Sequence, residues 1–256
     1  MKKMLIGFTG FVGSNINKQS KFHSLYNSKN IEELDESDHS LCVCTAAPAI
    51  KWHANKYPED DKKSIDSLIK NLEKINCNEL VLISTVDVFK NPVMVDELTN
   101  VSKTNLHPYG LHRRELEEYV QSRFKKSTIV RLPGLVGDGL KKNVIYDLTN
   151  NNNLKNCNLS SKFQFYPLNN IWLHIKIALK NNIPLIHLTS EPISVSEIVE
   201  NVFPEHRQKL KEFKINQEYD FRTIYGNLFN SNNCYQYSKD QSLEFIKMYK
   251  NTKNFI

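Results

Sequence analysis

A glycine-rich turn near the start of the chain constrains its fold more than any other feature. Gly7, Gly10 and Gly13 form a G-x-x-G-x-x-G pattern between an apolar segment, residues 4–8, and a helical segment, residues 12–19. In a dinucleotide-binding Rossmann unit, the first glycine permits a tight turn and the second lets the backbone approach a pyrophosphate, while the third allows the helix to pack closely on the strand. The helix N-terminus then faces the phosphates with free N–H groups and the positive end of its dipole.

These glycines also admit a simpler interpretation, in which they only turn the chain. Their position between a strand and a helix favours the phosphate loop, because the dinucleotide-binding fingerprint requires that context. In this interpretation the loop binds NADP or NAD. The loop residues expected to contact the cofactor are Gly7, Thr9, Gly10, Phe11, Val12 and Gly13.

Short apolar segments alternate with longer amphipathic segments, a pattern typical of a parallel α/β sheet. Residues 61–75 give the clearest helix, because their apolar side chains recur on one face with a period of 3.6 residues. Residues 80–84 are apolar almost throughout, as in a strand covered by helices on both faces. Further strands are expected over residues 22–26, 40–46, 128–132 and 185–188, and further helices over residues 109–124, 169–180 and 239–249.

The fold expected is therefore α/β, with a Rossmann-like, doubly wound parallel sheet. The sheet should be abbreviated, because residues 30–38 are too few for the usual helix–strand–helix passage after the second strand. We expect an NAD(P)-binding Rossmann region over residues 1–139. Residues 140–256 should form a small C-terminal substrate lobe on the same body, with the option of returning a strand to the sheet.

Composition excludes several other classes of protein. The 256 residues are 40% hydrophobic and carry a net charge of +6, and no apolar run approaches the roughly 20 residues that cross a bilayer. The five cysteines and eight histidines show no disulfide or metal spacing. The lysines are scattered and no nucleic-acid motif is present, so the charge suits a small anionic substrate equally well. We expect a cytoplasmic protein with no metal, membrane segment or nucleic-acid partner, and a homodimer is an open option.

The residues after the second expected strand bear on the choice of cofactor. An acidic side chain at this point usually accepts hydrogen bonds from the ribose 2′-hydroxyl of NAD. The sequence instead has Asn27, Ser28 and Lys29, which are able to donate to a 2′-phosphate. This favours NADP over NAD, and the alternative is a plain polar turn.

Five short segments together resemble one enzyme family. Residues 82–89 (L-I-S-T-V-D-V-F) are similar to a strand-end S-T/S-x-x-V-Y segment, and residues 108–113 (P-Y-G-L-H-R) to a helix start of the form P-Y-G-x-x-K. Residues 44–48, 131–137 and 191–198 follow the corresponding family segments in order. The chain thus resembles, over most of its length, the extended short-chain dehydrogenases/reductases, specifically the NAD-dependent nucleotide-sugar epimerases and dehydratases.

This resemblance implies a catalytic strip and a function. Tyr109 would exchange a proton with the substrate oxygen, Thr85 would hydrogen-bond the same oxygen, and a cation one helical turn beyond the tyrosine would lower its pKa. Ala46, Ala47 and Pro133 would lie beside the cofactor. The implied activity is that of an NAD(P)-dependent oxidoreductase or epimerase acting on a nucleotide-activated sugar, in the synthesis of surface polysaccharide.

The cation position departs from the family pattern, because it holds Arg113 and not lysine. Arginine stays charged and can stabilise a tyrosinate, but it cannot readily pass a proton onward and its planar fork is bulkier. Two other interpretations therefore stay open. One is a binding or regulatory protein that keeps NADP but has lost turnover, and the other is an interaction protein with an empty cleft. A purely structural interpretation makes Tyr109 a packing aromatic and Arg113 a surface charge.

Overall fold

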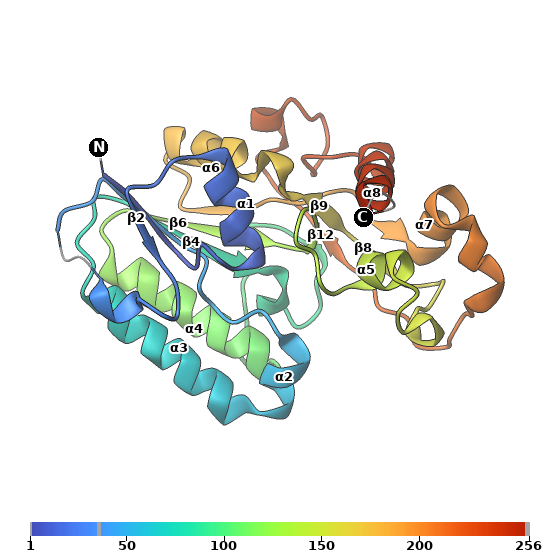
Figure 1. The fold of residues 1–256 in the computed structure, drawn as a ribbon, viewed down its shortest axis with the longest axis horizontal. Coiled ribbons are helices and arrows are strands. Elements are labelled where there is room, and N and C mark those ends of the chain that lie inside the picture. The colour runs from blue at the N-terminus through green and yellow to red at the C-terminus, as the bar shows by residue number, and fades with distance from the viewer. Residues whose placement is uncertain (1, 35–36, 254–256) are drawn as a thin grey trace. The chain divides into compact units, whose positions relative to one another are not determined.

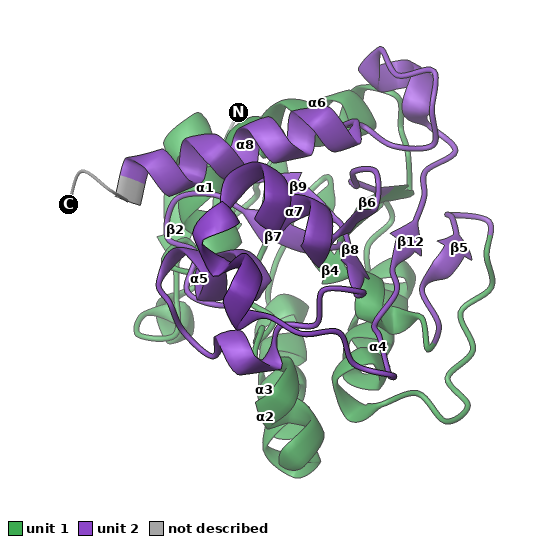
Figure 2. Cartoon of the chain, turned by 90° about the vertical axis from the view of Figure 1, so that its right-hand side faces the viewer, with its two compact units in different colours: residues 1–90, 99–132, 169–186 green, residues 91–98, 133–168, 187–256 purple. Residues whose placement is uncertain are grey.

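The computed structural model describes residues 2–34 and 37–253 of the chain (Figure 1). The chain divides into two compact units, shown in green and purple in Figure 2. Unit 1 comprises residues 1–90, 99–132 and 169–186, and unit 2 comprises residues 91–98, 133–168 and 187–256. The units therefore interleave along the sequence, where we expected a Rossmann region up to residue 139 and a lobe with the option of returning a strand to the sheet. The difference arises because residues 169–186, assigned from sequence to the lobe, complete the sheet of unit 1.

Unit 1 is built on a six-stranded sheet in the order β10-β6-β4-β3-β1-β2. Its strands are β1 (Lys3–Ile6), β2 (Ser24–Tyr26), β3 (Leu41–Cys44), β4 (Leu80–Thr85), β6 (Ser127–Leu132) and β10 (Leu185–His187). The neighbours from β2 to β6 pair in parallel. The first five residues of β4 are all buried, as its unbroken apolar sequence predicts. The predicted α/β class with a parallel Rossmann-like sheet is confirmed.

Helices cover both faces of this sheet, which makes it doubly wound. Figure 1 shows α1 and α6 on one face and α3 and α4 on the other. The helices of unit 1 are α1 (Phe11–Gln19), α2 (Lys51–Lys56), α3 (Pro58–Glu73), α4 (Pro108–Arg123) and α6 (Ile171–Lys180), with short 3-10 turns η1 (Ile31–Glu33), η2 (Val86–Val88) and η4 (Leu168–Asn170). The apolar stripe of α3 buries Ile65, Leu68 and Leu72 in the core beneath β3 and β4.

The strand order fixes where a ligand can bind. The chain runs from β1 through α1 to β2 on one side, and β3 then lies on the other side of β1. Open α/β sheets bind ligands at such a switch point, outside the carboxyl ends of the strands. Between β2 and β3, the described residues on either side of 35–36 contain only the single turn η1. This agrees with the expectation of an abbreviated sheet.

Unit 2 consists of three two-stranded pairs and several helices. Its strands are β5 (Val93–Val95), β7 (Gly134–Val136), β8 (Lys162–Phe163), β9 (Phe165–Pro167), β11 (Ile193–Ser194) and β12 (Asp220–Phe221), paired as β5 with β12, β7 with β9 and β8 with β11. Its helices are α5 (Val144–Thr149), α7 (Val195–Val202) and α8 (Lys239–Lys253), with 3-10 turns η3 (Leu154–Asn156), η5 (Pro204–Lys209) and η6 (Gly226–Phe229). Ser194 and Glu197 form a capping box at the start of α7.

None of the helices in the described residues combines the length and apolar character that crossing a membrane requires. The same residues contain no group of three or more His, Cys, Asp or Glu side chains placed to hold a metal ion.

Candidate functional site

The turn after β1 brings its glycines against the exit of β3. Gly7 has a φ of +87°, a conformation that side chains rarely adopt. A Cβ atom on Gly7 would lie 2.6 Å from Thr45 Oγ1, and one on Gly13 would lie 2.1 Å from the carbonyl oxygen of Gly7. The Thr45 hydroxyl donates to the carbonyls of Ile6 (2.9 Å) and Gly7 (3.1 Å), which ties the loop to β3. Glycine is therefore required at positions 7 and 13 for packing alone.

Gly10 differs from the other two glycines because a side chain there would meet fewer and more distant atoms. A Cβ atom there would have one close neighbour, the Gly7 carbonyl oxygen at 3.3 Å. Gly10 is exposed and is the N-cap residue of α1, so it has no side chain to occupy the amides of the first helical turn. An exposed backbone at a helix N-terminus, with room beside it, fits the pyrophosphate of a dinucleotide.

The other predicted cofactor residues surround this loop or lie in unit 2. Thr9 is exposed, and Phe11 and Val12 begin α1. Ala46 and Ala47 follow β3, and the Ala46 amide would be 2.9 Å from a Cβ on Gly7. Pro133 belongs to unit 2.

The segment after β2 is a hydrogen-bonded turn. Asn27 Oδ1 accepts from the Lys29 amide at 2.8 Å, and Asn30 Oδ1 accepts from the Asn27 amide at 2.8 Å. Ser28 and Lys29 are exposed. The Asn27 side chain thus holds the turn, while Ser28 and Lys29 are available to a ligand.

Tyr109 and Thr85 meet at the carboxyl end of β4. Thr85 is the last residue of β4, and its side chain lies near enough to the Tyr109 phenol to lower the pKa of that phenol. Tyr109 is the second residue of α4, is 8% exposed, and donates its backbone N–H to Asn55 Oδ1 at 3.0 Å. A Cβ on Gly110 would lie 2.0 Å from the Asp87 carbonyl oxygen, so the glycine lets α4 approach the turn after β4. Local backbone packing therefore fixes the Tyr109–Thr85 pair.

Arg113 is buried and its guanidinium is already engaged. Its two terminal nitrogens form a bidentate ion pair with the Asp61 carboxylate, with Nη2 to Oδ1 at 2.8 Å. They also donate to the carbonyl oxygens of Pro48 and Tyr109. The side chain is 3% exposed, and its Cζ lies 4.0 Å from the centroid of the Tyr109 ring. Arg113 is therefore not a surface charge. Its terminal nitrogens donate to buried groups of the protein itself.

The Asp61 carboxylate forms hydrogen bonds with two residues of α4. Besides Arg113, the Nδ1 of His112 lies 2.7 Å from Asp61 Oδ2. Burial alone would raise the pKa of this carboxyl, but the hydrogen bonds and charges of Arg113 and His112 outweigh it and lower the pKa below its usual value. Asp61 therefore stays ionised and balances the charge of Arg113.

The pKa of the Tyr109 phenol is raised, whereas that of Asp61 is lowered. Burial raises its pKa above the ordinary value, and the charge of Arg113 and the hydrogen bond from Thr85 oppose this only in part. Asp87 adds to the rise, and Lys51, which pairs with Asp87 at 2.6 Å, opposes it. Tyr109 is thus a protonated phenol at neutral pH.

A second buried ion pair, between Glu117 and Arg131, contacts the end of β4 through Ser84. Glu117, fully buried on α4, accepts from Arg131 Nε at 2.9 Å and from Arg131 Nη2 at 2.7 Å. Ser84, next to Thr85, donates to the same carboxylate at 2.6 Å. This network links α4, β4 and β6 directly beneath the Tyr109–Thr85 pair.

The fold is shared with solved structures of sugar-nucleotide enzymes. The Bordetella bronchiseptica enzyme WbmG, in complex with NAD, has a TM-score of 0.76 at 12% identity, over 98% of this chain and 94% of that one. UDP-glucose 4-epimerase from Thermotoga maritima has a TM-score of 0.75 at 12% identity, over 99% and 100%. A dTDP-4-dehydrorhamnose reductase from Clostridium acetobutylicum has a TM-score of 0.71 at 15% identity, over 99% and 100%. The chain has the fold of the extended short-chain dehydrogenases.

Sequence comparison adds nothing to this likeness, since no family model and no curated protein matches the chain. Within the short-chain dehydrogenase fold, the structure brings Tyr109, Thr85 and Arg113 together, as the motif spacing predicts.

Sequence reasoning missed Asp61 and Glu117. Glu117 follows Arg113 by one helical turn, so its position on the same face was a usable signal. Asp61 lies 52 residues from Arg113 in the sequence, and no local sequence pattern indicates that they pair.

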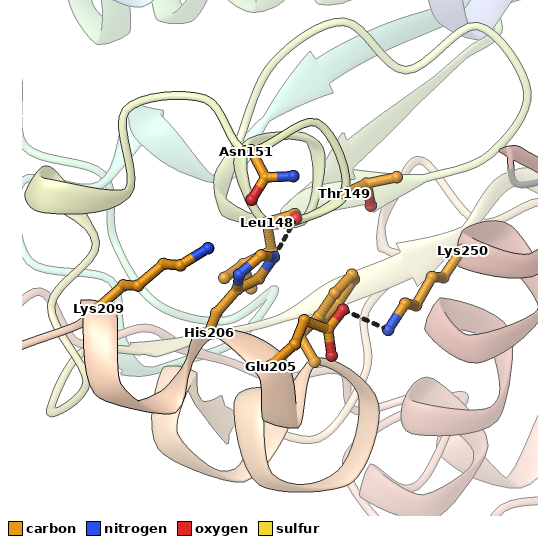
Figure 3. A pocket seen from close by; sticks show the side chains of 8 residues that line it. Leu148, Thr149, Asn151, Glu205, His206, Lys209 and Lys250 are labelled. Atoms are coloured by element: carbon orange, nitrogen blue, oxygen red, sulfur yellow. Dashed lines mark hydrogen bonds and ion pairs between the residues drawn. The ribbon is translucent and has the colours of Figure 1, made fainter.

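Unit 2 of this short-chain dehydrogenase fold contains a separate hollow of about 290 Å³ between α5, η5 and α8 (Figure 3). His206 is buried in its wall and its Nε2 lies 2.8 Å from the Leu148 carbonyl oxygen. Lys250 is held by Glu205 and by the carbonyl of Val202, both at 2.7 Å. Lys250 and Glu205 thus form an ion pair at this hollow, while the buried Nδ1 of His206 has no partner among the described residues.

Proposed function

We propose that the protein is an NAD(P)-dependent oxidoreductase or epimerase that acts on a nucleotide-activated sugar, with Tyr109 as its acid/base group. The observation that carries the proposal is the placement of the buried Tyr109 phenol near the Thr85 side chain, at the carboxyl end of β4 in a short-chain dehydrogenase fold, with the Arg113 Cζ 4.0 Å from the Tyr109 ring centroid. Fold alone is a poor guide to function, so the proposal depends on this pair of side chains.

The cofactor would be held by the turn after β1. The open backbone at Gly10 and the first turn of α1 would receive the pyrophosphate, and Ser28 and Lys29 would lie near the adenosine ribose. When bound, a nicotinamide dinucleotide supplies hydride exchange at the substrate carbon. Solved neighbours contain NAD, whereas Lys29 is our reason for proposing NADP for this chain.

The protein's own contribution is a positioned proton. Tyr109 would exchange its phenolic proton with the substrate oxygen, within hydrogen-bonding reach of Thr85. The Thr85 hydroxyl, which also accepts from the Asp87 amide at 3.1 Å, would orient that oxygen. The Gly110 contact keeps both groups in register.

The ligands of the solved neighbours support the proposed substrate class. Solved structures of this fold include one with UDP-glucose and one with both UDP-glucose and NAD. The net charge of +6 suits an anionic nucleotide diphosphate. We infer a nucleotide-activated sugar, used in polysaccharide biosynthesis.

A second candidate is an NAD(P)-binding protein without turnover. The observation in its favour is that Arg113 uses its terminal nitrogens on Asp61 and on backbone carbonyls, where the family pattern has a lysine. In this alternative the Tyr109 region is a structural core and the phosphate loop still binds cofactor.

Thermal unfolding and absorbance separate the two candidates. Purified protein is first tested for stabilisation by NAD, NADP and nucleotide sugars, and then for sugar-dependent absorbance change at 340 nm. An oxidoreductase shows both effects. Stabilisation by cofactor with no absorbance change, and no conversion of one nucleotide sugar into its epimer, establishes the binding protein and contradicts the enzyme.

A further inference from the structure

The hollow in unit 2 has a buried ring nitrogen in its wall that pairs with no other group of the described residues. His206 is 3% exposed, and its Nε2 lies 2.8 Å from the Leu148 carbonyl oxygen. Because a carbonyl oxygen only accepts, Nε2 carries the proton, and the atom without a partner is Nδ1. Figure 3 shows Nδ1 on the side of the ring that faces the Lys209 side chain. Since buried polar atoms normally have a partner, Nδ1 is a candidate point of contact for a ligand.

The ring of His206 is held in one orientation by the residues packed around it. It stacks on Phe203, with ring centroids 6.1 Å apart and an angle of 16° between the planes. The Lys250 ammonium in turn lies 4.7 Å from the centroid of the Phe203 ring. With the hydrogen bond to Leu148, this packing fixes the direction in which Nδ1 points, so the contact is formed before a ligand arrives.

Two ammonium groups also line the hollow. Lys250 uses two of its three N–H donors on Glu205 and on the Val202 carbonyl, both at 2.7 Å. Lys209 is exposed, so its ammonium is available to a ligand. Glu205 is the one carboxylate in the lining, and the residues that α5 and the following turn contribute are uncharged. The lining therefore favours an anion.

We propose that this hollow binds the phosphoryl group of a small phosphate monoester. Its oxygens would accept from the Lys209 and Lys250 ammonium groups, and one proton would lie between a phosphoryl oxygen and His206 Nδ1. A phosphate monoester loses its second proton near pH 6, so at neutral pH it can either bring a proton to Nδ1 or accept one from it. A carboxylate or a sulfate at this pH can only accept, which makes the phosphoryl group the better match.

The size of the hollow favours an organic ester over the bare ion. Its volume of about 290 Å³ is close to the lower end of small-molecule sites, roughly 300 Å³, and leaves room beyond a phosphoryl group. The Asn151 amide and the oxygen of the Thr149 hydroxyl, which donates to Ile145 at 2.8 Å, are polar groups that the remaining part could meet. All the lining residues belong to unit 2, so the proposal does not depend on the proposed function.

The test observes the His206 ring directly. Full-length protein labelled with ¹⁵N at histidine is titrated at pH 7 with sodium phosphate, and the ring signals are assigned through bonds from the backbone. We expect a saturable shift of the Nδ1 resonance in the direction of a protonated nitrogen. Sodium chloride at equal ionic strength should leave this resonance in place. An Nδ1 signal that does not respond to phosphate, or that responds equally to chloride, overturns the proposal.

A pair of matched variants then assigns the response to the hollow. Lys209→Gln should weaken phosphate binding by about tenfold, because one charge-assisted hydrogen bond is lost. Arg207→Gln removes the same charge from an exposed residue of η5 that does not line the hollow, so its affinity should stay within about twofold of the native value. Equal weakening in both variants would show a response to net charge alone and would overturn the site.

The choice of anion completes the test. Glycerol 3-phosphate should bind at least as tightly as inorganic phosphate, and sodium sulfate should bind more weakly than either. Weaker binding of glycerol 3-phosphate than of inorganic phosphate overturns the assignment of an organic ester. Binding of sulfate as tight as that of phosphate overturns the shared proton at His206.

Discussion

The Cζ atom of Arg113 lies 4.0 Å from the centroid of the Tyr109 ring, one turn further along α4. The same guanidinium pairs with Asp61 on α3 and donates to Pro48 after β3. One side chain thus fixes the phenol ring, a neighbouring helix and the loop that leaves the sheet. Substitutions here should affect stability and chemistry together, whereas substitutions of the phenol should separate the two.

Replacing Tyr109 with phenylalanine should lower turnover by about 10²–10⁴-fold, because the ring remains while the transferable proton is lost. The melting temperature should change little, since only one hydroxyl group and its interaction with Thr85 are lost. Thr85→Ala should reduce turnover less. Tyr119→Phe is a matched control on the same helix, because the Tyr119 hydroxyl has no partner among the described residues. Equal activity in Tyr109→Phe and native protein would remove Tyr109 from the mechanism.

Replacing Asp61 with asparagine should destabilise the protein by about 3–5 kcal/mol, because it leaves the buried Arg113 without its counter-charge. Urea unfolding measures this loss. Lys62→Ala is the control on the neighbouring position, since Lys62 pairs with Asp66 on the surface and such pairs contribute roughly 0–1 kcal/mol. A loss in Asp61→Asn no larger than in Lys62→Ala would show that the buried pair is dispensable.

The same carboxyl predicts how stability depends on pH. The folded state lowers the pKa of Asp61, so its contribution is complete above the unfolded value of about 3.9 and is lost as pH falls through the lower folded value. Between pH 5 and pH 2, native protein should lose more stability than Asp61→Asn. Parallel acid unfolding curves would contradict the shift.

The phosphate loop can be tested with two glycines that differ in their surroundings. Gly10→Val should fold with a small loss of stability, because the φ of −72° suits any residue and a Cβ there needs only a slight shift of the Gly7 oxygen at 3.3 Å, yet it should abolish stabilisation by cofactor. Gly13→Ala should unfold at lower temperature, since its Cβ would lie 2.1 Å from that oxygen. Normal cofactor binding by Gly10→Val would show that the loop does not hold the pyrophosphate.

The turn after β2 predicts the preferred cofactor. NADP should raise the melting temperature more than NAD, and a ligand at a hundred times its dissociation constant adds about 2.7 kcal/mol. Lys29→Glu should reverse the order, because a carboxylate repels a 2′-phosphate and accepts from a 2′-hydroxyl. Asn27→Ala should destabilise the turn without changing the order, since Asn27 Oδ1 is bound to the Lys29 amide. Equal stabilisation by both cofactors would assign the turn a structural role alone.

Much of unit 1 could be predicted because its signals are local. The 3.6-residue period of α3, the apolar run of β4 and the glycines after β1 each act within a few residues of chain. The division into units could not be predicted in this way, because it depends on residues 169–186 pairing with strands far back in the sequence.

The same difference between local and long-range signals decides how much of the candidate site could be predicted. Motif spacing was enough to bring Tyr109 and Thr85 together, since both stand at fixed offsets from the ends of α4 and β4. The partner of Arg113 was invisible, because an aspartate in the first turn of a helix is ordinarily read as favourable to the helix dipole. Only the packing of α3 on α4 shows that Asp61 faces inward.

The late arrival of β10 has a consequence for synthesis of the chain. When the ribosome has added residue 132, β1, β2, β3, β4 and β6 can pair, but the edge of β6 that β10 will occupy is bare. At about 5–20 residues per second, several seconds pass before residues 185–187 follow. An unpaired strand edge is a template for other nascent chains during that interval. Chains stopped near residue 139 should therefore aggregate, whereas chains extended past α6 and β10 should remain monodisperse long enough to finish folding.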